Sequence, residues 1–167
     1  MHRNSFTLKL ATSVLAGLMF SGMAWGEAAQ KANPRFVTNG DTVYDKKSHL
    51  TWARCNVGQH WKNGVGCEGK TETFTFDDAR QQRKGGWRVP TRDDFGTLSG
   101  ETGGKRKSGI DEENFQEMNL GNQTYWTSTP SSAGDDWGVT FSGGQFLNVK
   151  RIAGIPVRLV RGGHKKP

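Results

Sequence analysis

One arginine stands out as a residue that could bind an anion, but its surroundings favour a structural role. Residues 86–91, GWRVPT, place Arg88 between Trp87 and a valine–proline pair, directly before a segment with the features of a helix start. An arginine can hold an anionic substrate, yet it can also pair with a carboxylate through two hydrogen bonds and stack on an aromatic ring. The motif contains no nucleophile and no acid–base partner. We therefore interpret Arg88 as a joint between a strand and a helix.

The sequence contains none of the common catalytic signatures. It has no Gly-x-Ser-x-Gly elbow, no His-Glu-x-x-His zinc motif and no phosphate-binding glycine loop. His49, His60 and His164 are isolated in sequence, which does not favour a metal site. The carboxylate pairs at residues 93–94 and 135–136 are adjacent, and adjacent side chains seldom face one site. We expect no enzymatic activity, no metal and no cofactor.

Cys55 and Cys67 are the only cysteines, and they predict a disulfide. An even number of cysteines in an exported chain favours a cross-link, whereas a zinc site needs closer pairs or accompanying histidines. Closing a loop of this length would stabilise the fold by roughly 3 kcal/mol in the chain-entropy model.

The N-terminal segment has the layout of a secretory signal peptide. Residues 1–26 begin with basic side chains, continue with an apolar run too short to span a bilayer comfortably, and end in Ala-Trp-Gly. An uncleaved membrane anchor is the alternative. We expect cleavage on export to the periplasm or the medium, with no stable membrane insertion afterwards. The rest would comprise a loose N-terminus at residues 27–34, one domain at residues 35–161 and a basic tail at residues 162–167.

The composition limits how such a domain can be held together. Only 33% of the residues are hydrophobic and 23 are glycine, which excludes a broad aliphatic core. A buried aromatic side chain covers more area than an aliphatic one, so tryptophans are efficient anchors in such a chain. We expect many loops, short strands and little helix. The tryptophans to which we assign a structural role are Trp52, Trp87, Trp126 and Trp137.

The chain is basic, with 23 Lys and Arg residues against 16 Asp and Glu residues and a formal net charge of +7. Two of the basic residues fall within residues 1–26, so the mature chain would have 21 basic and 16 acidic residues, a net charge of +5. An excess of this size favours anionic partners, but surface solubility explains it equally well. Charge alone leaves both explanations open.

Strand signals lie in both the first and the last third of the domain. Residues 35–45 hold two short apolar runs around Asn39-Gly40-Asp41, which is hairpin turn chemistry. A second polar turn at residues 46–49 precedes a third strand, so a small meander is predicted before the cysteine loop. Further strands are predicted at residues 125–129, 137–141, 146–149 and 156–160.

Two short helices are predicted between these regions. Thr75 and Thr91 are each followed three residues later by an aspartate, Asp78 and Asp94, an arrangement that resembles a capping box with Asp in place of Glu. Aspartates in the first turn also interact favourably with the positive end of the helix dipole. The glycine pair at residues 85–86 is expected to end the first helix.

Six short motifs in a fixed order support a resemblance to a known family. They are NGDTV with LTW before a cysteine, TFDDA, GWRVPT, YWTST, WGVTF and VRLVR, at residues 39–55, 75–79, 86–91, 125–129, 137–141 and 157–161. On these motifs the chain resembles the Lcl C-terminal domain family of bacterial exported proteins, from about residue 35 to residue 161. That family is similar to the C-type-lectin-like superfamily, and its GWRVPT element resembles one in formylglycine-generating enzymes.

The resemblance implies an α+β protein with a C-type-lectin-like fold, two short helices and a twisted antiparallel sheet. It also implies binding of sulfated glycosaminoglycans and formation of a trimer, as in the tip domain of a collagen-like adhesin of this family. This sequence has no collagen-like Gly-X-Y segment to support a trimer. It also lacks the active cysteines of formylglycine-generating enzymes and the Glu-Pro-Asn or Gln-Pro-Asp motif of calcium-dependent lectins, so neither activity is expected.

The partner favoured by these observations is an anionic polysaccharide, bound through salt-sensitive contacts with basic side chains. A solvated basic face is the alternative explanation of the same residues. A protein of the cell envelope, bound by residues 131–136 and 145–151, is the alternative partner, and nucleic acid is not expected after export. The candidate ligand-binding residues are Arg80, Arg83 and Lys84 along the first helix, Lys105, Arg106 and Lys107 in a loop, and Lys150 and Arg151 after a strand.

Overall fold

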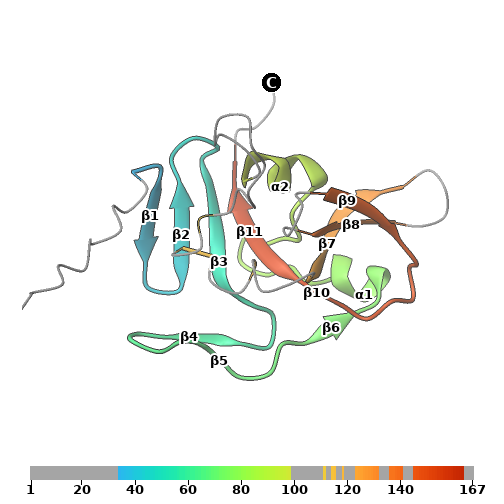
Figure 1. The fold of residues 1–167 in the computed structure, drawn as a ribbon, viewed down its shortest axis with the longest axis horizontal. Helices are drawn as coiled ribbons and strands as arrows, with labels where there is room; N and C mark the ends of the chain where they lie inside the picture. Colours follow the sequence, from blue (N-terminus) through green and yellow to red (C-terminus); the bar gives the residue numbers. More distant parts are fainter. Residues whose placement is uncertain are drawn as a thin grey trace, which may run out of the picture. The chain divides into compact units, whose positions relative to one another are not determined.

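The computed structural model describes residues 34–98, 111, 114–115, 118, 123–131, 136–140 and 145–163. Within these ranges, short antiparallel strands and two short helices make up the fold, which confirms the α+β class (Figure 1). The strands are divided among four small sheets rather than gathered in one. The C-type-lectin-like assignment stays a prediction. The expected signal peptide at residues 1–26 lies outside the described ranges, in which no helix is long and apolar enough to cross a membrane.

The N-terminal meander and the C-terminal strand build a four-stranded sheet, as Figure 1 shows from blue to red. Gly40 and Asp41 form a two-residue turn in which Gly40 has a φ of +57°, a conformation that such hairpins need. This turn fixes the register and places Val37 directly opposite Tyr44. The strands, in spatial order, are β1 (Phe36–Asn39), β2 (Thr42–Asp45), β3 (Leu50–Asn56) and β11 (Arg158–Gly162).

The remaining strands form three smaller sheets. They are the hairpin of β4 (His60–Lys62) with β5 (Gly66–Glu68), the pair of β6 (Thr73–Phe74) with β10 (Ile155–Pro156), and the sheet of β7 (Thr124–Pro130), β8 (Asp136–Thr140) and β9 (Gln145–Val149). The closing strand expected at residues 156–160 is divided at Val157. Its first part pairs with β6 and its second part with β3, so the chain passes from one sheet to another at this residue.

Both helices begin at the threonines that the sequence indicates. They are α1 (Phe76–Arg80) and α2 (Arg92–Leu98). The Thr91 hydroxyl accepts a hydrogen bond from the Asp94 N–H at 3.0 Å, and the Asp94 carboxylate accepts one from the Thr91 N–H at 2.7 Å, which is a complete capping box. Thr75 caps α1 by accepting from the Asp78 N–H at 3.3 Å.

The end of α1 differs from the sequence expectation. The helix ends at Arg80, because the Gln81 N–H bonds to the Asp78 carbonyl and tightens the last turn, well before the glycine pair at residues 85–86. Arg83 and Lys84 therefore do not lie along one helix with Arg80, and the expectation that they do is wrong. They belong to the turn that leads to the GWRVPT segment.

Two aromatic cores lie on opposite sides of β7. Successive side chains of a strand point to opposite faces, so Tyr125 enters one core and Trp126 the other. In the first core, the Trp52 ring lies 5.3 Å from the Phe95 ring of α2. In the second, Trp126 lies 5.5 Å from Phe76 of α1 and donates its indole N–H to the Phe74 carbonyl at 2.7 Å. Of the four tryptophans expected to have a structural role, Trp52 and Trp126 are fully buried in these cores. Trp87 and Trp137 are partly exposed and belong to neither core.

A buried ion pair ties the start of the four-stranded sheet to α2. The Arg35 guanidinium donates to both carboxylate oxygens of Asp45, at 2.7 and 2.6 Å, and to the Thr97 carbonyl at 2.6 Å. Burial alone would raise the pKa of Asp45, but hydrogen bonds from Arg35, Ser48 and the Lys47 N–H, together with the Arg35 charge, lower it below the ordinary value of 3.8. Asp45 is therefore ionised at neutral pH and has a structural role.

The predicted disulfide between Cys55 and Cys67 is present and joins β3 to β5, closing a loop that contains β4. Replacing both cysteines by alanine should lower the free energy of unfolding by about 3 kcal/mol, because the unfolded chain loses a loop constraint. Urea unfolding at neutral pH measures this change. Reducing the parent protein with dithiothreitol should give the same loss, and an unchanged unfolding midpoint in both experiments would show that the cross-link contributes nothing to stability.

Candidate functional site

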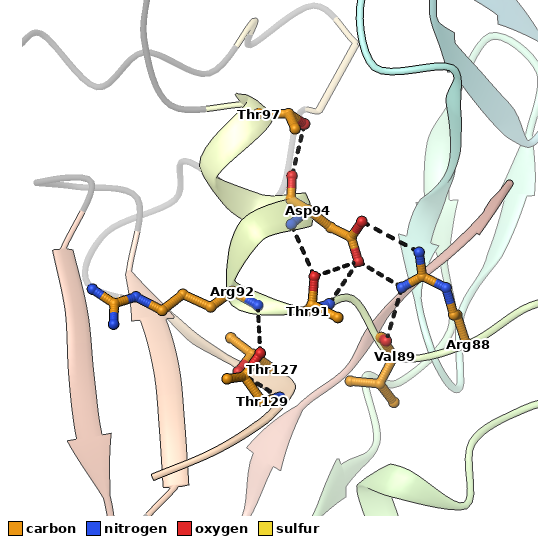
Figure 2. Close-up of polar contacts among 8 residues, drawn as sticks. All are labelled: Arg88, Val89, Thr91, Arg92, Asp94, Thr97, Thr127 and Thr129. Atoms are coloured by element: carbon orange, nitrogen blue, oxygen red, sulfur yellow. Dashed lines mark hydrogen bonds and ion pairs between the residues drawn. The ribbon is translucent and has the colours of Figure 1, made fainter. Parts of the chain in front are cut away.

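Arg88 joins the edge of the four-stranded sheet to α2. Its N–H and carbonyl exchange hydrogen bonds with Val160 of β11, both at 2.9 Å, so the backbone at Arg88 extends the sheet. Its guanidinium donates to the two carboxylate oxygens of Asp94 at 2.5 and 3.2 Å (Figure 2). The pairing is the one that a structural arginine would make, and it leaves the charge of Arg88 neutralised by an internal partner.

The carboxylate of Asp94 collects several hydrogen bonds at this joint. Besides Arg88, it accepts from the Thr91 N–H at 2.7 Å and from the Thr91 hydroxyl at 2.8 Å, as the dashed lines in Figure 2 show. Partial burial would raise the pKa of Asp94, but the bonds from Arg88 and Thr91 and the Arg88 charge lower it below the ordinary value of 3.8. Asp94 is a helix cap and an ion-pair partner at once.

Trp87, next to Arg88, lies on the opposite side of the sheet from the core. Gly85 and Gly86 have φ values of +59° and +83°, and the Trp87 N–H bonds to the Lys84 carbonyl at 3.0 Å, so residues 84–87 form a tight turn. This turn makes Lys84 and Trp87 cross-strand neighbours. The Arg161 guanidinium of β11 lies 4.7 Å from the centre of the Trp87 ring. We call Lys84, Trp87 and Arg161 the Trp87 cluster.

A second group of basic side chains surrounds α1. The guanidinium groups of Arg151 and Arg80 lie 4.7 and 5.6 Å from the centre of the Phe76 ring. Arg151 also pairs with Asp77 at 2.6 Å and with the fully buried Asp136 at 3.1 Å. Because two carboxylates already hold Arg151, an acidic ligand would have to compete with them for this side chain.

The predicted ligand-binding residues thus fall into separate groups. Arg80 and Arg151 each lie near the Phe76 ring, whereas Lys84 belongs to the Trp87 cluster. Arg83 and Lys150 are exposed, and no interaction places either of them in the two groups. The predicted loop cluster of Lys105, Arg106 and Lys107 lies outside the described residues.

The outer face of the four-stranded sheet contains residues that sequence reasoning missed. Tyr44, which is 37% exposed, places its hydroxyl 3.0 Å from Nδ1 of His49. His49 has a φ of +57°, the only positive φ among the described residues other than glycine, and such a conformation costs free energy that glycine would avoid. The two-residue turn at Gly40 was the available signal, because it fixes the register that puts Val37 and Tyr44 side by side.

The three-stranded sheet presents another cation–aromatic contact. The Arg92 guanidinium lies 4.5 Å from the centre of the Trp137 ring and 4.7 Å from that of Phe146, so it joins the start of α2 to β8 and β9. Of the predicted segment 131–136, the structure describes the two ends, and the Ser131 hydroxyl lies 3.2 Å from the side-chain oxygen of Asn148 in the predicted segment 145–151. Within the described ranges, no three His, Cys, Asp or Glu side chains are grouped to hold a metal ion.

The ionised state of Asp94 gives a pH-dependent prediction. Because its pKa is lowered in the folded state, its contribution is complete above about pH 4 and is lost as the pH falls through the folded pKa. Asp94→Asn should therefore lower the free energy of unfolding by roughly 2 kcal/mol at pH 7. The difference from the parent protein should shrink as the pH falls below 3.8. Urea unfolding at several pH values measures it.

Asp93→Asn is the matched control, because Asp93 is an exposed aspartate in the same helical turn. It removes the same charge near the helix start but no part of the joint, and should cost less than about 1 kcal/mol. Equal losses for the two variants at pH 7 would show that the Arg88–Asp94 pairing adds nothing beyond helix electrostatics.

The comparisons with known proteins identify the family of the chain. No curated protein matches the chain. The family model of the Lcl C-terminal domain matches residues 41–161, which is most of the chain and includes both helices, the disulfide and the Trp87 cluster. The chain therefore belongs to the Lcl C-terminal domain family.

Proposed function

We propose that this chain is an exported, non-enzymatic binding module that recognises anionic polysaccharides through basic side chains. Export is supported by the signal-like layout of residues 1–26 and by the Cys55–Cys67 disulfide, which persists in oxidising compartments. The membership of the Lcl C-terminal domain family is compatible with both parts of the proposal.

The observation on which the proposal rests is the composition of the Trp87 cluster. Lys84 and Arg161 are exposed, and among the described residues no carboxylate forms an ion pair with either of them. By contrast, Arg88 is paired with the largely buried Asp94, and Arg151 is paired with the buried Asp136 and the exposed Asp77. Two cations beside a half-buried tryptophan ring can therefore take up acidic groups without first breaking an ion pair.

The chemistry of the cluster suits a sulfated or carboxylated sugar. The guanidinium of Arg161 can donate two parallel hydrogen bonds to a sulfate or carboxylate group, and Lys84 adds a second positive charge. The Trp87 ring offers an apolar surface against which the C–H face of a sugar can pack. All of these groups lie at the surface, so salt should weaken the binding strongly.

A protein of the cell envelope is the second candidate partner. The connection between β9 and β10 exposes Ile152, which is 84% accessible, and Leu147 of β9 is 39% accessible. Both lie in or next to the predicted segment 145–151. Removing residues 132–135 should abolish capture of a purified envelope partner if this face binds protein, and should leave retention on heparin unchanged.

Retention on immobilised heparin tests the proposal. The purified chain with its disulfide intact should bind heparin at low salt and elute as the salt concentration rises. The double variant Lys84→Gln/Arg161→Gln should elute at lower salt and bind about tenfold more weakly, because it loses two surface charge contacts of about 0.7 kcal/mol each.

The matched control is Lys62→Gln/Lys70→Gln, which removes the same charge from the region of the disulfide hairpin. It should elute close to the parent protein, since Lys62 already pairs with Glu68 at 3.0 Å. The proposal fails if the parent protein shows no salt-sensitive retention while an unrelated protein of equal net charge is retained.

A further inference from the structure

We propose that the outer face of the four-stranded sheet is a track along which one extended acidic polysaccharide chain crosses the strands. Tyr44 and Trp87 each support a sugar ring, and Lys84 and Arg161 bind acidic groups near the Trp87 end. The inference rests on the proposed function, and it adds the path of the ligand and the minimum length of chain that fills the site.

The strand register places the residues of the track in one row. Val37 of β1 lies opposite Tyr44 of β2, Tyr44 opposite Thr51 of β3, and Thr51 opposite Arg161 of β11. Residues directly opposite one another in antiparallel strands point to the same face. The bridge between Arg88 and Val160 continues the sheet by one more segment and brings Trp87 to Arg161.

The opposite face of the same strands supplies the core. Val43, Trp52 and Val160 alternate with members of the row along the strands and are fully buried. One face of the sheet is therefore packed against the core, and the other face is exposed to solvent. The row runs, in spatial order, through Val37, Tyr44, Thr51, Arg161, Trp87 and Lys84, and none of these side chains is acidic.

Two features at the Tyr44 end of this face cost free energy unless the face has a partner. Val37 and Tyr44 are 46% and 37% exposed, and they are direct cross-strand neighbours, so they form a joint apolar surface in water. His49 adopts a left-handed conformation beside them and places its imidazole against the Tyr44 hydroxyl, with 3.0 Å between the polar atoms. A glycine would relieve the backbone strain but would supply no side chain to orient Tyr44.

The spacing of the two rings sets the length of the ligand. Neighbouring strands lie about 4.8 Å apart, so the three steps from β2 to the Trp87 segment span about 14 Å. Each strand step is comparable to the advance of one pyranose residue along an extended chain. A tetrasaccharide is then the shortest chain that can place one sugar on Tyr44 and another on Trp87.

The charge and twist of the face identify the class of chain. The two cations and the absence of a carboxylate from the row favour an acidic polysaccharide over a neutral one. Adjacent strands are rotated by roughly 20° relative to one another, so the row turns as it crosses the sheet. A soluble chain that can twist fits such a row, whereas the flat surface of a crystalline neutral polysaccharide does not.

Binding of heparin-derived oligosaccharides of defined length tests the track. Tryptophan fluorescence of the purified, disulfide-intact chain serves as the readout. Affinity should rise steeply between the disaccharide and the tetrasaccharide, which is the shortest chain that reaches both rings, and the octasaccharide should bind at least as tightly as the tetrasaccharide. Tyr44→Ala should weaken octasaccharide binding about tenfold through loss of ring contact, and should leave disaccharide binding at the Trp87 cluster unchanged. Lys84→Gln should weaken both.

Two further variants separate the role of Tyr44 from a loss of folding. Tyr44→Phe keeps the ring and should retain most of the octasaccharide affinity. His49→Gly should keep or raise the midpoint of thermal unfolding, because it removes the strained conformation, yet weaken octasaccharide binding by disturbing the Tyr44 ring. Insoluble cellulose, a flat neutral surface, should not retain the parent protein.

The outcomes distinguish the track from the underlying function. If Tyr44→Ala and His49→Gly bind the octasaccharide like the parent while Lys84→Gln binds it more weakly, the track is wrong and the proposed function stands. If affinity does not depend on oligosaccharide length, the track is likewise wrong. If no acidic oligosaccharide of any length binds the parent protein, the proposed function fails together with the inference.

Discussion

The bidentate pairing of Arg88 with Asp94 holds the edge of the four-stranded sheet against the start of α2. Arg88 is part of the sheet edge through its backbone bonds to Val160, and Asp94 is part of α2 through the capping box with Thr91. The ion pair therefore holds a strand and a helix start at a fixed distance. Because α2 places Phe95 against Trp52, the same pairing also positions the first aromatic core. The neighbouring Trp87 is left on the outer face.

The small hydrophobic content of the chain explains why a few aromatic rings and ion pairs position the sheets and helices relative to one another. With 23 glycines and many short strands, the described core consists of rings that bridge between sheets rather than of a continuous aliphatic layer. Trp52 and Trp126 bridge different sheets and helices from opposite sides of β7. Ion pairs such as Arg35–Asp45 add directional contacts between elements where the apolar area is insufficient. A domain built in this way can leave a whole sheet face unburied.

Sequence reasoning succeeded where a local cause fixes the structure. The turn at Gly40, the caps at Thr75 and Thr91, the disulfide and the α+β class each follow from residues close together in the chain. It failed at the end of α1, where a tightened last turn ends the helix before the glycine pair. It also missed the Trp87 cluster, since Lys84 and Arg161 are 77 positions apart and meet only through the pairing of Arg88 with Val160. Long-range strand pairing is not encoded in any short pattern.

The net charge does not show which basic residues could bind a ligand. What distinguishes them from basic residues with a structural role is whether their side chains are already paired with a carboxylate of the same chain. Arg35, Arg88 and Arg151 all face aspartates inside the fold, and in each case the carboxylate belongs to a different structural element or to a helix cap. Because each of these charges is already paired with a carboxylate, it stabilises the fold and is less available to a ligand. Lys84 and Arg161 face solvent beside an aromatic ring and have no described carboxylate partner. A chain with few apolar residues needs cations of the first kind to fold, so only cations of the second kind give information about a ligand.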